Sequence, residues 1–157
     1  MSESNESTTK KSKKKKKKRR RGFAGIIWNQ LKILNESEYF KENYGDQTFN
    51  VLLISTDDRH AAFVKLKEGT IDVDDIKYDK KDPQAIQDLI QTKDHDGLLK
   101  TDLETFFKLA QGKISTFGLL KMVITRNIRG VSTMLVFSKF FSVAAHEVKN
   151  QSQNKDK

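Results

Sequence analysis

The sequence predicts an α/β fold of the α+β type, in which helices cover a mostly antiparallel sheet of four or five strands. Short apolar runs between turn residues are typical of strands, and residues 48–55 form the first of them. Apolar residues three or four apart on either side of these runs predict helices. The first strand carries apolar side chains on both faces, so we expect cover on both sides of the sheet.

A helix is expected over residues 22–34, directly after a strongly basic segment. Its apolar residues recur at helical spacing on one face: Phe23, Ile27, Leu31 and Leu34. We expect this face to pack on the sheet, which is the commoner use of an apolar helix face. The alternative is that this helix, with its one Trp, lies in a membrane interface beside the basic segment.

Three strands are expected after the first one, at residues 61–66, 70–73 and 98–100. Glu68 and Gly69 form the turn between the first two of these. Asp82 followed by Pro83 indicates the start of a helix, because Asp caps helices and Pro favours their first turn. That helix is expected to end near Thr92.

A short capped helix and a further strand are expected in residues 96–130. Thr101 and Glu104 match a capping box, in which each side chain bonds the backbone amide of the other residue. Helical spacing continues up to Gly112, which is placed as a left-handed C-terminal cap. The segments expected next are a turn near Ser115, an apolar pair at 119–120 and a strand over residues 122–128, which Gly130 ends.

The last predicted helix, residues 131–146, is apolar around most of its circumference. Only Lys139 and His146 are ionisable in it, so it needs cover on more than one side. Core packing, a ligand cavity, a partner chain and a bilayer would each supply that cover, and the residues alone leave these alternatives open. Residues 149–157 are polar and are expected to form a disordered C-terminal tail.

The order of these motifs resembles the sterol carrier protein 2 domain, a small lipid-binding module. The resemblance covers roughly residues 47–145 and is carried by Asp102, Leu103, Phe106, Phe107, Leu109, Gly112, Lys113, Leu119, Leu120, Asn127, Ile128, Arg129 and Gly130. Residues 63–69 are also similar to the second strand of the family and its acidic-Gly hairpin. Met122 stands near where many members carry Gly, and Asn127 replaces a more usual Lys.

The resemblance implies that residues 22–148 form a sterol carrier protein 2-like domain. Such a domain would bind and transfer a hydrophobic lipid, of sterol, isoprenoid or fatty-acyl type, in an apolar tunnel closed by the last helix. The candidate lipid-binding residues are Phe106, Phe107, Leu119, Leu120, Phe137, Phe140 and Phe141. The alternative is a structural or partner-binding module that the basic tail tethers to nucleic acid or a ribosome.

The net charge of +9 belongs to the N-terminal tail. Residues 1–21 hold eleven of the 30 Lys and Arg residues and two of the 21 acids, which leaves 19 of each in residues 22–157. We expect this self-repelling tail to be disordered. An anionic membrane surface is its expected partner, with nucleic acid and a merely solubilising role as alternatives. The candidate polyanion-binding residues are Lys13, Lys14, Lys15, Lys16, Lys17, Lys18, Arg19, Arg20 and Arg21.

The sequence offers little chemistry for catalysis or metal binding. The absence of Cys excludes disulfides, thiolate zinc sites and thiol nucleophiles. His95 lies between Asp94 and Asp96 with no second His at ligand spacing, so a turn explains it better than a zinc site. No GxSxG, HExxH or phosphate-binding Gly-rich motif occurs. We therefore expect a non-catalytic protein with no metal or cofactor.

The expected location is the cytoplasm, with peripheral association with membranes. No run of residues approaches the roughly 18 apolar positions that a membrane span needs. No apolar segment of the kind found in secretory signals follows the charged N-terminus.

Overall fold

The computed structural model describes residues 18–155 of the chain. In chain order, its elements are α1 (Gly22–Leu31), η1 (Lys32–Glu36), α2 (Glu38–Tyr44), β1 (Thr48–Ser55), β2 (His60–Lys67), β3 (Thr70–Lys77), α3 (Pro83–Thr92), β4 (Gly97–Thr101), α4 (Leu103–Ala110), α5 (Thr116–Ile124), β5 (Ile128–Arg129) and α6 (Val131–Lys155). No helix among the described residues combines the length and the hydropathy of a membrane span.

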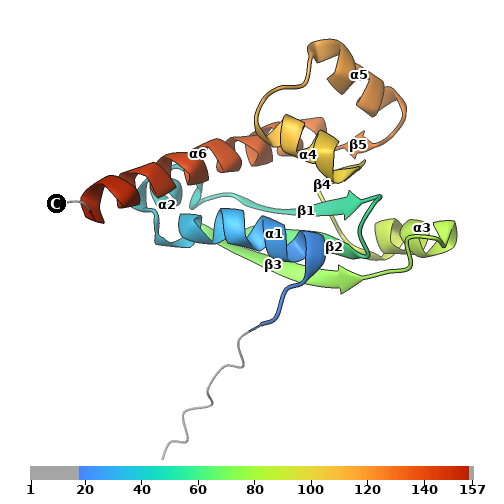
Figure 1. Cartoon of the computed structure of the whole chain (residues 1–157), viewed down its shortest axis with the longest axis horizontal. Helices are drawn as coiled ribbons and strands as arrows, with labels where there is room; N and C mark the ends of the chain where they lie inside the picture. The colour runs from blue at the N-terminus through green and yellow to red at the C-terminus, as the bar shows by residue number, and fades with distance from the viewer. Residues whose placement is uncertain (1–17, 156–157) are drawn as a thin grey trace, which may run out of the picture.

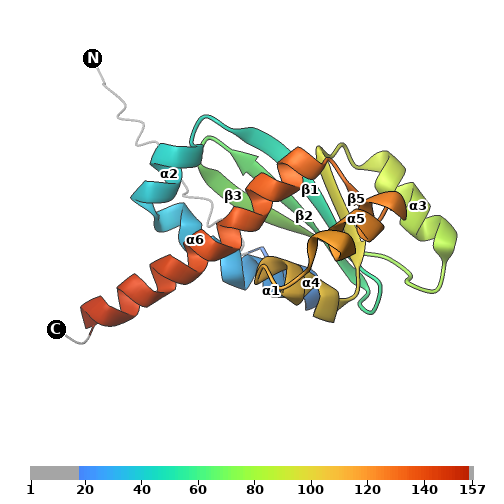
Figure 2. The ribbon, with the colours of Figure 1, turned by 90° about the horizontal axis from the view of Figure 1, so that it is seen from above.

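The five strands form one sheet in the order β3-β2-β1-β4-β5. Neighbouring strands are antiparallel except β1 and β4, which run parallel with Val51 opposite Gly97. The turn from β2 to β3 uses Glu68 and Gly69, both with the positive φ that a tight hairpin turn requires. The predicted α+β fold, a mostly antiparallel sheet covered by helices, is confirmed (Figures 1 and 2).

Helices cover both faces of the sheet, and the larger core lies on the face of α1, α4 and α6 (Figures 1 and 2). Val51 and Leu53 of β1 point into this core, whereas Leu52 and Ile54 point into a smaller core beside α3. All four side chains are fully buried. The alternation explains why the first strand is apolar on both faces, and the packing of α1 on β2 and β3 places its apolar face against the sheet.

The long helix α6 crosses the sheet and takes its cover from several elements at once. It contacts η1, α1, α4 and three strands, which accounts for its nearly continuous apolar surface. Phe140 is fully buried and packs edge to face on Phe40, with ring centroids 4.9 Å apart. The helix also continues to Lys155, past the predicted helix end at His146 and the predicted domain end at residue 148. A contact of 3.2 Å between His146 Nδ1 and Asn150 Nδ2 spans one turn of this extension.

Two aspartates in the turn between β1 and β2 fix the starts of two helices. The Asp58 carboxylate accepts a hydrogen bond of 2.6 Å from the amide of Phe23, in the first turn of α1. The Asp57 carboxylate accepts one of 3.2 Å from the amide of Leu103, at the first residue of α4. Because unpaired amides and the dipole at a helix start favour a negative partner, this turn holds both helices against the sheet.

The outer edge of β3 is covered by side chains from the N-terminal part of the chain. The amide group of Asn35 bonds both the N–H and the carbonyl of Ile71, at 2.7 and 2.9 Å. The guanidinium of Arg20 donates a 2.7 Å bond to the carbonyl of Val73 and lies 3.8 Å over the Trp28 ring. These contacts occupy backbone groups that could otherwise pair with a strand of another chain. They also place residues 18–21 on the folded domain, before the predicted domain start at residue 22.

Two local predictions in residues 101–128 are wrong. Thr101 ends β4, and the helix cap is Asp102, whose carboxylate accepts 2.8 Å bonds from the backbone amide and the hydroxyl of Thr105. Residues 122–124, predicted to begin a strand, are the last turn of α5, and only Ile128 and Arg129 pair with β4.

Candidate ligand-binding cavity

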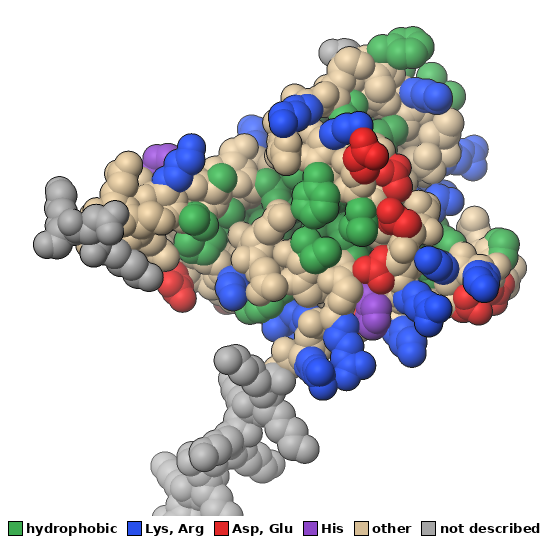
Figure 3. Space-filling model, in the orientation of Figure 1, with side chains coloured by type: hydrophobic (Ala, Val, Ile, Leu, Met, Phe, Trp, Pro, Cys, Tyr) green, Lys and Arg blue, Asp and Glu red, His purple; other side chains and the backbone are tan. Residues whose placement is uncertain are grey.

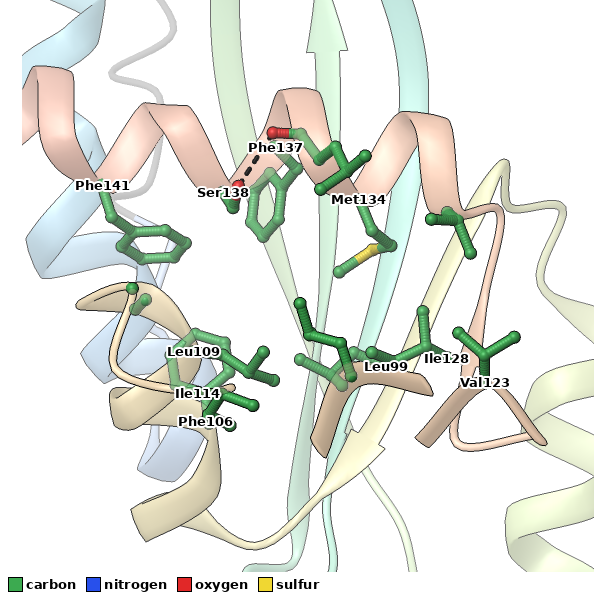
Figure 4. A pocket seen from close by; sticks show the side chains of 15 residues that line it. Leu99, Phe106, Leu109, Ile114, Val123, Ile128, Met134, Phe137, Ser138 and Phe141 are labelled. Atoms are coloured by element: carbon green, nitrogen blue, oxygen red, sulfur yellow. Dashed lines mark hydrogen bonds between the residues drawn. The ribbon is translucent and has the colours of Figure 1, made fainter. Parts of the chain in front are cut away.

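An apolar cavity of about 300 Å³ lies between the β4–β5 end of the sheet and the helices α4, α5 and α6 (Figure 4). Its walls come from Leu99, Phe106, Leu109, Ala110, Gly112, Ile114, Leu119, Val123, Ile128, Val131, Met134, Leu135, Phe137, Ser138 and Phe141. This volume is at the lower end of the range typical of small-molecule sites, which are mostly apolar and concave.

The floor and one wall come from the sheet and from one stripe of α6. Leu99 of β4 faces the cavity, while its neighbour Leu98 faces the smaller core, because successive strand residues point to opposite sides. Met134, Phe137 and Phe141 of α6 are three and four residues apart, so their side chains share one helix face (Figure 4). The Phe137 and Phe141 rings also pack edge to face on each other, with centroids 5.4 Å apart.

The opposite wall depends on how α4 ends. The amides of Gly112 and Lys113 bond back to the carbonyls of Leu109 and Lys108, at 3.0 and 2.8 Å, in the pattern of a Schellman cap. Gly112 has φ +67°, the left-handed conformation that this cap needs, as the sequence predicted. The cap turns the chain so that Ile114 reaches the cavity alongside Leu109 (Figure 4).

Two capped helix starts position α4 and α5 around the cavity. At α4, the hydrogen bonds from the Thr105 amide and hydroxyl lower the pKa of Asp102, so this cap is charged at neutral pH. At α5, the Ser115 hydroxyl accepts a 3.1 Å bond from the amide of Gly118. This second cap begins a helix where the sequence pattern indicates only a turn and an apolar pair.

The described lining residues include one polar side chain, that of Ser138. Its hydroxyl donates a 2.8 Å hydrogen bond to the carbonyl of Leu135 (Figure 4). The hydroxyl oxygen keeps lone pairs with which it can accept a further bond. No charged side chain is among the described residues of the walls, so the interior favours an uncharged apolar group.

The cavity opens to the surface along the gap between α5 and α6. Three of its lining residues there are exposed: Val123 by 38%, Val131 by 43% and Leu135 by 56%. Those deeper in the site, such as Phe137 at 1% and Phe106 at 3%, are buried. The site is therefore an open-mouthed apolar cavity and not a sealed void.

The structure places four of the seven predicted lipid-binding residues in the cavity walls: Phe106, Leu119, Phe137 and Phe141. Phe140 instead fills the core beside Phe40 and Tyr44. Phe107 packs beside Phe106 outside the lining, and Leu120 points outward with 53% of its surface exposed. These three side chains therefore lie outside the cavity lining, because burial and helix orientation direct them elsewhere.

Sequence reasoning missed the other eleven lining residues, including Leu99, Leu109, Ile114, Ile128 and Met134. The alternation along β4 could have identified Leu99, and the three- and four-residue spacing along α6 could have identified Met134. Ile114 offers no such signal, because its position depends on the cap at the end of α4.

The predicted polyanion-binding residues fall into two groups. Lys13 to Lys17 lie outside the described residues. Lys18 forms ion pairs with Asp72 and Asp74, and Arg20 forms one of 2.6 Å with Asp72. Arg19 and Arg21 are exposed. Partial burial opposes ionisation of the two aspartates, but the hydrogen bonds and charges of the basic side chains outweigh it and lower their pKa values.

The histidines have local partners instead of a shared site. His60 Nδ1 lies 2.6 Å from a carboxylate oxygen of Asp75, and His95 Nδ1 lies 2.6 Å from the carbonyl of Lys93. Within the part of the chain that the structure describes, no group of three or more His, Cys, Asp or Glu side chains is placed to hold a metal ion.

Comparison with known proteins identifies a similar solved structure. No protein-family model matches the chain, and no curated protein matches it. The chain is similar to the crystal structure of sterol carrier protein 2, with 13% sequence identity and a TM-score of 0.49. The match covers 76% of this chain and 93% of that chain.

Proposed function

We propose that this protein binds a hydrophobic lipid, of sterol, isoprenoid or fatty-acyl type, in the cavity between α4, α5, α6 and the sheet. The observation that carries the proposal is the open cavity of about 300 Å³ with almost wholly apolar walls. Removing apolar ligand surface from water contributes about 25 cal/mol per Å². A ligand could therefore bind by hydrophobic burial, with few polar contacts.

The character of the walls restricts how the ligand lies. A charged head group would lose its hydration inside without gaining a partner, so the apolar part enters and the polar end stays at the mouth. Ser138 is the one described polar side chain in the walls, and its hydroxyl oxygen can accept a bond from a ligand hydroxyl. We propose binding and transfer without catalysis, because Ser138 has no basic side chain beside it among the described lining residues.

The basic N-terminal segment, in this proposal, attracts the protein to anionic membranes. Eleven Lys and Arg residues in positions 1–21 support it, since each contributes about 1 kcal/mol near an anionic surface at moderate salt. Lys18 and Arg20 are already paired with aspartates of β3, so they anchor the segment. Removing residues 1–17 should then weaken binding to acidic liposomes and leave lipid uptake unchanged. Equal liposome binding by both chains would contradict this role.

The first test of ligand binding is native mass spectrometry on protein purified without detergent, followed by extraction of any bound lipid. An adduct of one molecule per chain, from one lipid class, would support the proposal and identify the ligand. An apo mass, with no uptake of a fluorescent fatty acid or sterol analogue afterwards, would contradict it. That second outcome would favour a partner-binding module tethered by the basic segment.

A further inference from the structure

The outward face of α5 is a stripe of exposed apolar side chains. Phe117, Leu120 and Ile124 are three and four residues apart, so they lie along one side of this nine-residue helix. They are exposed by 77%, 53% and 72% respectively. The opposite side of α5 is occupied by Leu119 and Met122, which pack against the main core. The helix is thus apolar on both sides, and only the inner side has cover within the described chain.

This stripe continues into the mouth of the cavity. Val123, Val131 and Leu135 are exposed lining residues next to it. Together with the stripe, they make up six of the nine exposed large hydrophobic residues in the described part of the chain. We call these six residues the mouth patch. Such a concentration of exposed apolar surface in one place is typical of an interaction site.

The charged side chains of the chain segment that holds the mouth patch have one sign. Residues 105–146, which contain most of α4, all of α5 and β5, and more than half of α6, include six Lys or Arg residues and no Asp or Glu. Lys113 precedes α5, Lys121 lies within it and Arg126 follows it. All three are exposed, and none is in an ion pair within the described residues. Figure 3 shows hydrophobic and basic side chains together at the end of the molecule where α5 lies.

We propose that the mouth patch inserts into the surface of an anionic phospholipid bilayer. Apolar side chains beside lysine and arginine are the composition of interfacial helices, whose apolar side enters the acyl region while the bases meet lipid phosphates. The mouth of the cavity would then face the bilayer. This inference rests on the proposed function in one respect, since a docked mouth lets a lipid pass between membrane and cavity without crossing water.

The shape and charge of this region favour a bilayer over a second copy of the chain. α5 stands away from the sheet at one end of the molecule, so it presents a projecting tip and not a flat face (Figure 1). Two copies meeting at this tip would bring like charges together, which is unfavourable. The described residues of the basic segment, 18–21, lie against β3 on the side of the molecule away from α5 (Figure 1), so the two basic regions are separate.

Co-sedimentation of the full chain with vesicles tests the proposal. We expect stronger binding to vesicles of phosphatidylcholine and phosphatidylserine in equal parts than to phosphatidylcholine alone. The double variant Phe117→Glu and Ile124→Glu should lower the affinity for the mixed vesicles by at least about tenfold, because both apolar anchors are lost. Val148→Glu is the matched control, since Val148 is 53% exposed on the distal part of α6, and it should leave binding unchanged.

Insertion is separated from adsorption by a Leu120→Trp variant. Its added fluorescence should shift to the blue on mixed vesicles and be quenched by brominated acyl chains. Absence of both changes would overturn the proposal, as would unaltered vesicle binding by the double variant. A dimer in solution that the double variant converts to a monomer would overturn it in favour of a second copy.

Failure of this inference is distinguishable from failure of the proposed function. Phe117 and Ile124 do not line the cavity, so the double variant should take up a soluble fluorescent fatty acid as the wild type does. Uptake with unaltered vesicle binding in the variant would refute only the insertion. Vesicle binding that depends on the mouth patch, without any uptake of ligand, would refute only the lipid-carrying function.

Discussion

Filling the cavity with a side chain of the protein should increase stability and decrease ligand binding at the same time. Ala110 lies in the cavity wall near the end of α4, so Ala110→Phe directs a phenyl ring into the site. A cavity of about 150 Å³ is enough to hold benzene. The ring would therefore take roughly half of the 300 Å³ present here.

The two effects can be estimated from the same geometry. Filling an apolar cavity commonly raises the free energy of unfolding by about 0.5–2 kcal/mol. For a chain of this size, each kcal/mol raises Tm by roughly 2–4 °C. If the ring excludes about 60 Å² of ligand surface, the ligand loses roughly 1.5 kcal/mol of burial. That loss is about a tenfold decrease in affinity.

Thermal unfolding of the ligand-free protein and titration with a fluorescent fatty acid measure these effects. Ala145→Phe is the matched control, because Ala145 is an exposed helix residue that does not line the cavity. The control should change neither quantity appreciably. Wild-type ligand affinity in a normally folded Ala110→Phe protein would refute the reasoning, because it would show that the ligand binds elsewhere.

Three further predictions concern the scaffold. Gly130→Ala should lower the free energy of unfolding by at least about 2 kcal/mol in urea titrations, since its Cβ would lie 1.9 Å from the Asp96 carbonyl oxygen at a residue with φ +64°. Asp58→Ala should lower the free energy of unfolding, measured by thermal melts, by about 1 kcal/mol, because the amide of Phe23 loses its hydrogen-bond acceptor. Asp58→Asn keeps an acceptor oxygen and should retain most of that stability. Burial, followed by the charges of two nearby aspartates, raises the pKa of Tyr78 to about 12. The pKa of tyrosine in the unfolded chain is about 10. The contribution of Tyr78 to the free energy of unfolding should therefore be constant below about pH 10 and decrease between about pH 10 and pH 12. In denaturation measured against pH, Tyr78→Phe should remove this alkaline loss.

The first four strands and one helix start could be predicted from the sequence because local signals and tertiary packing agree there. Residues 48–55 were predicted as a strand and form β1. Asp82 caps α3 by accepting a 2.9 Å bond from the amide of Gln84, with Pro83 in the first turn, as its residue type indicates. In each case the local residue pattern and the tertiary packing favour the same conformation.

The region from Ser115 to Ile128 was misassigned because its pattern is ambiguous. An amphipathic helix is recognised by a polar face, and α5 lacks one: it packs Leu119 inward and exposes Ile124 outward. Apolar and β-branched residues in sequence then indicate a strand. The helix ends in a Schellman cap at Arg126, which has φ 58° where Gly is the usual residue, so the usual stop signal is also absent.

The cavity could be predicted in kind but not in detail. The sequence indicates that aromatic residues of the last helix belong to the core or to the lining of a cavity, and both arrangements occur. Phe137 lines the cavity, while Phe140, three residues later, is surrounded by Phe40 and Tyr44. Side chains on one helix face therefore line the cavity or fill the core, depending on which elements pack against them. Residue type cannot make that division, because core and cavity walls have the same composition.

The equal numbers of acids and bases in residues 22–157 conceal an uneven distribution along the chain. Several acids are engaged in fixed contacts: Asp58 caps α1, and Asp72 and Asp74 hold Lys18 and Lys65. Residues 105–146 contain six bases and no acid, and of these bases only Lys108 has an acidic partner among the described residues, Glu104 just before the segment. A domain that is neutral by count therefore has a basic region around α5, formed by the exposed Lys113, Lys121 and Arg126. Attraction of that region to an anionic bilayer should weaken as salt is added, while the apolar anchoring of α5 should not.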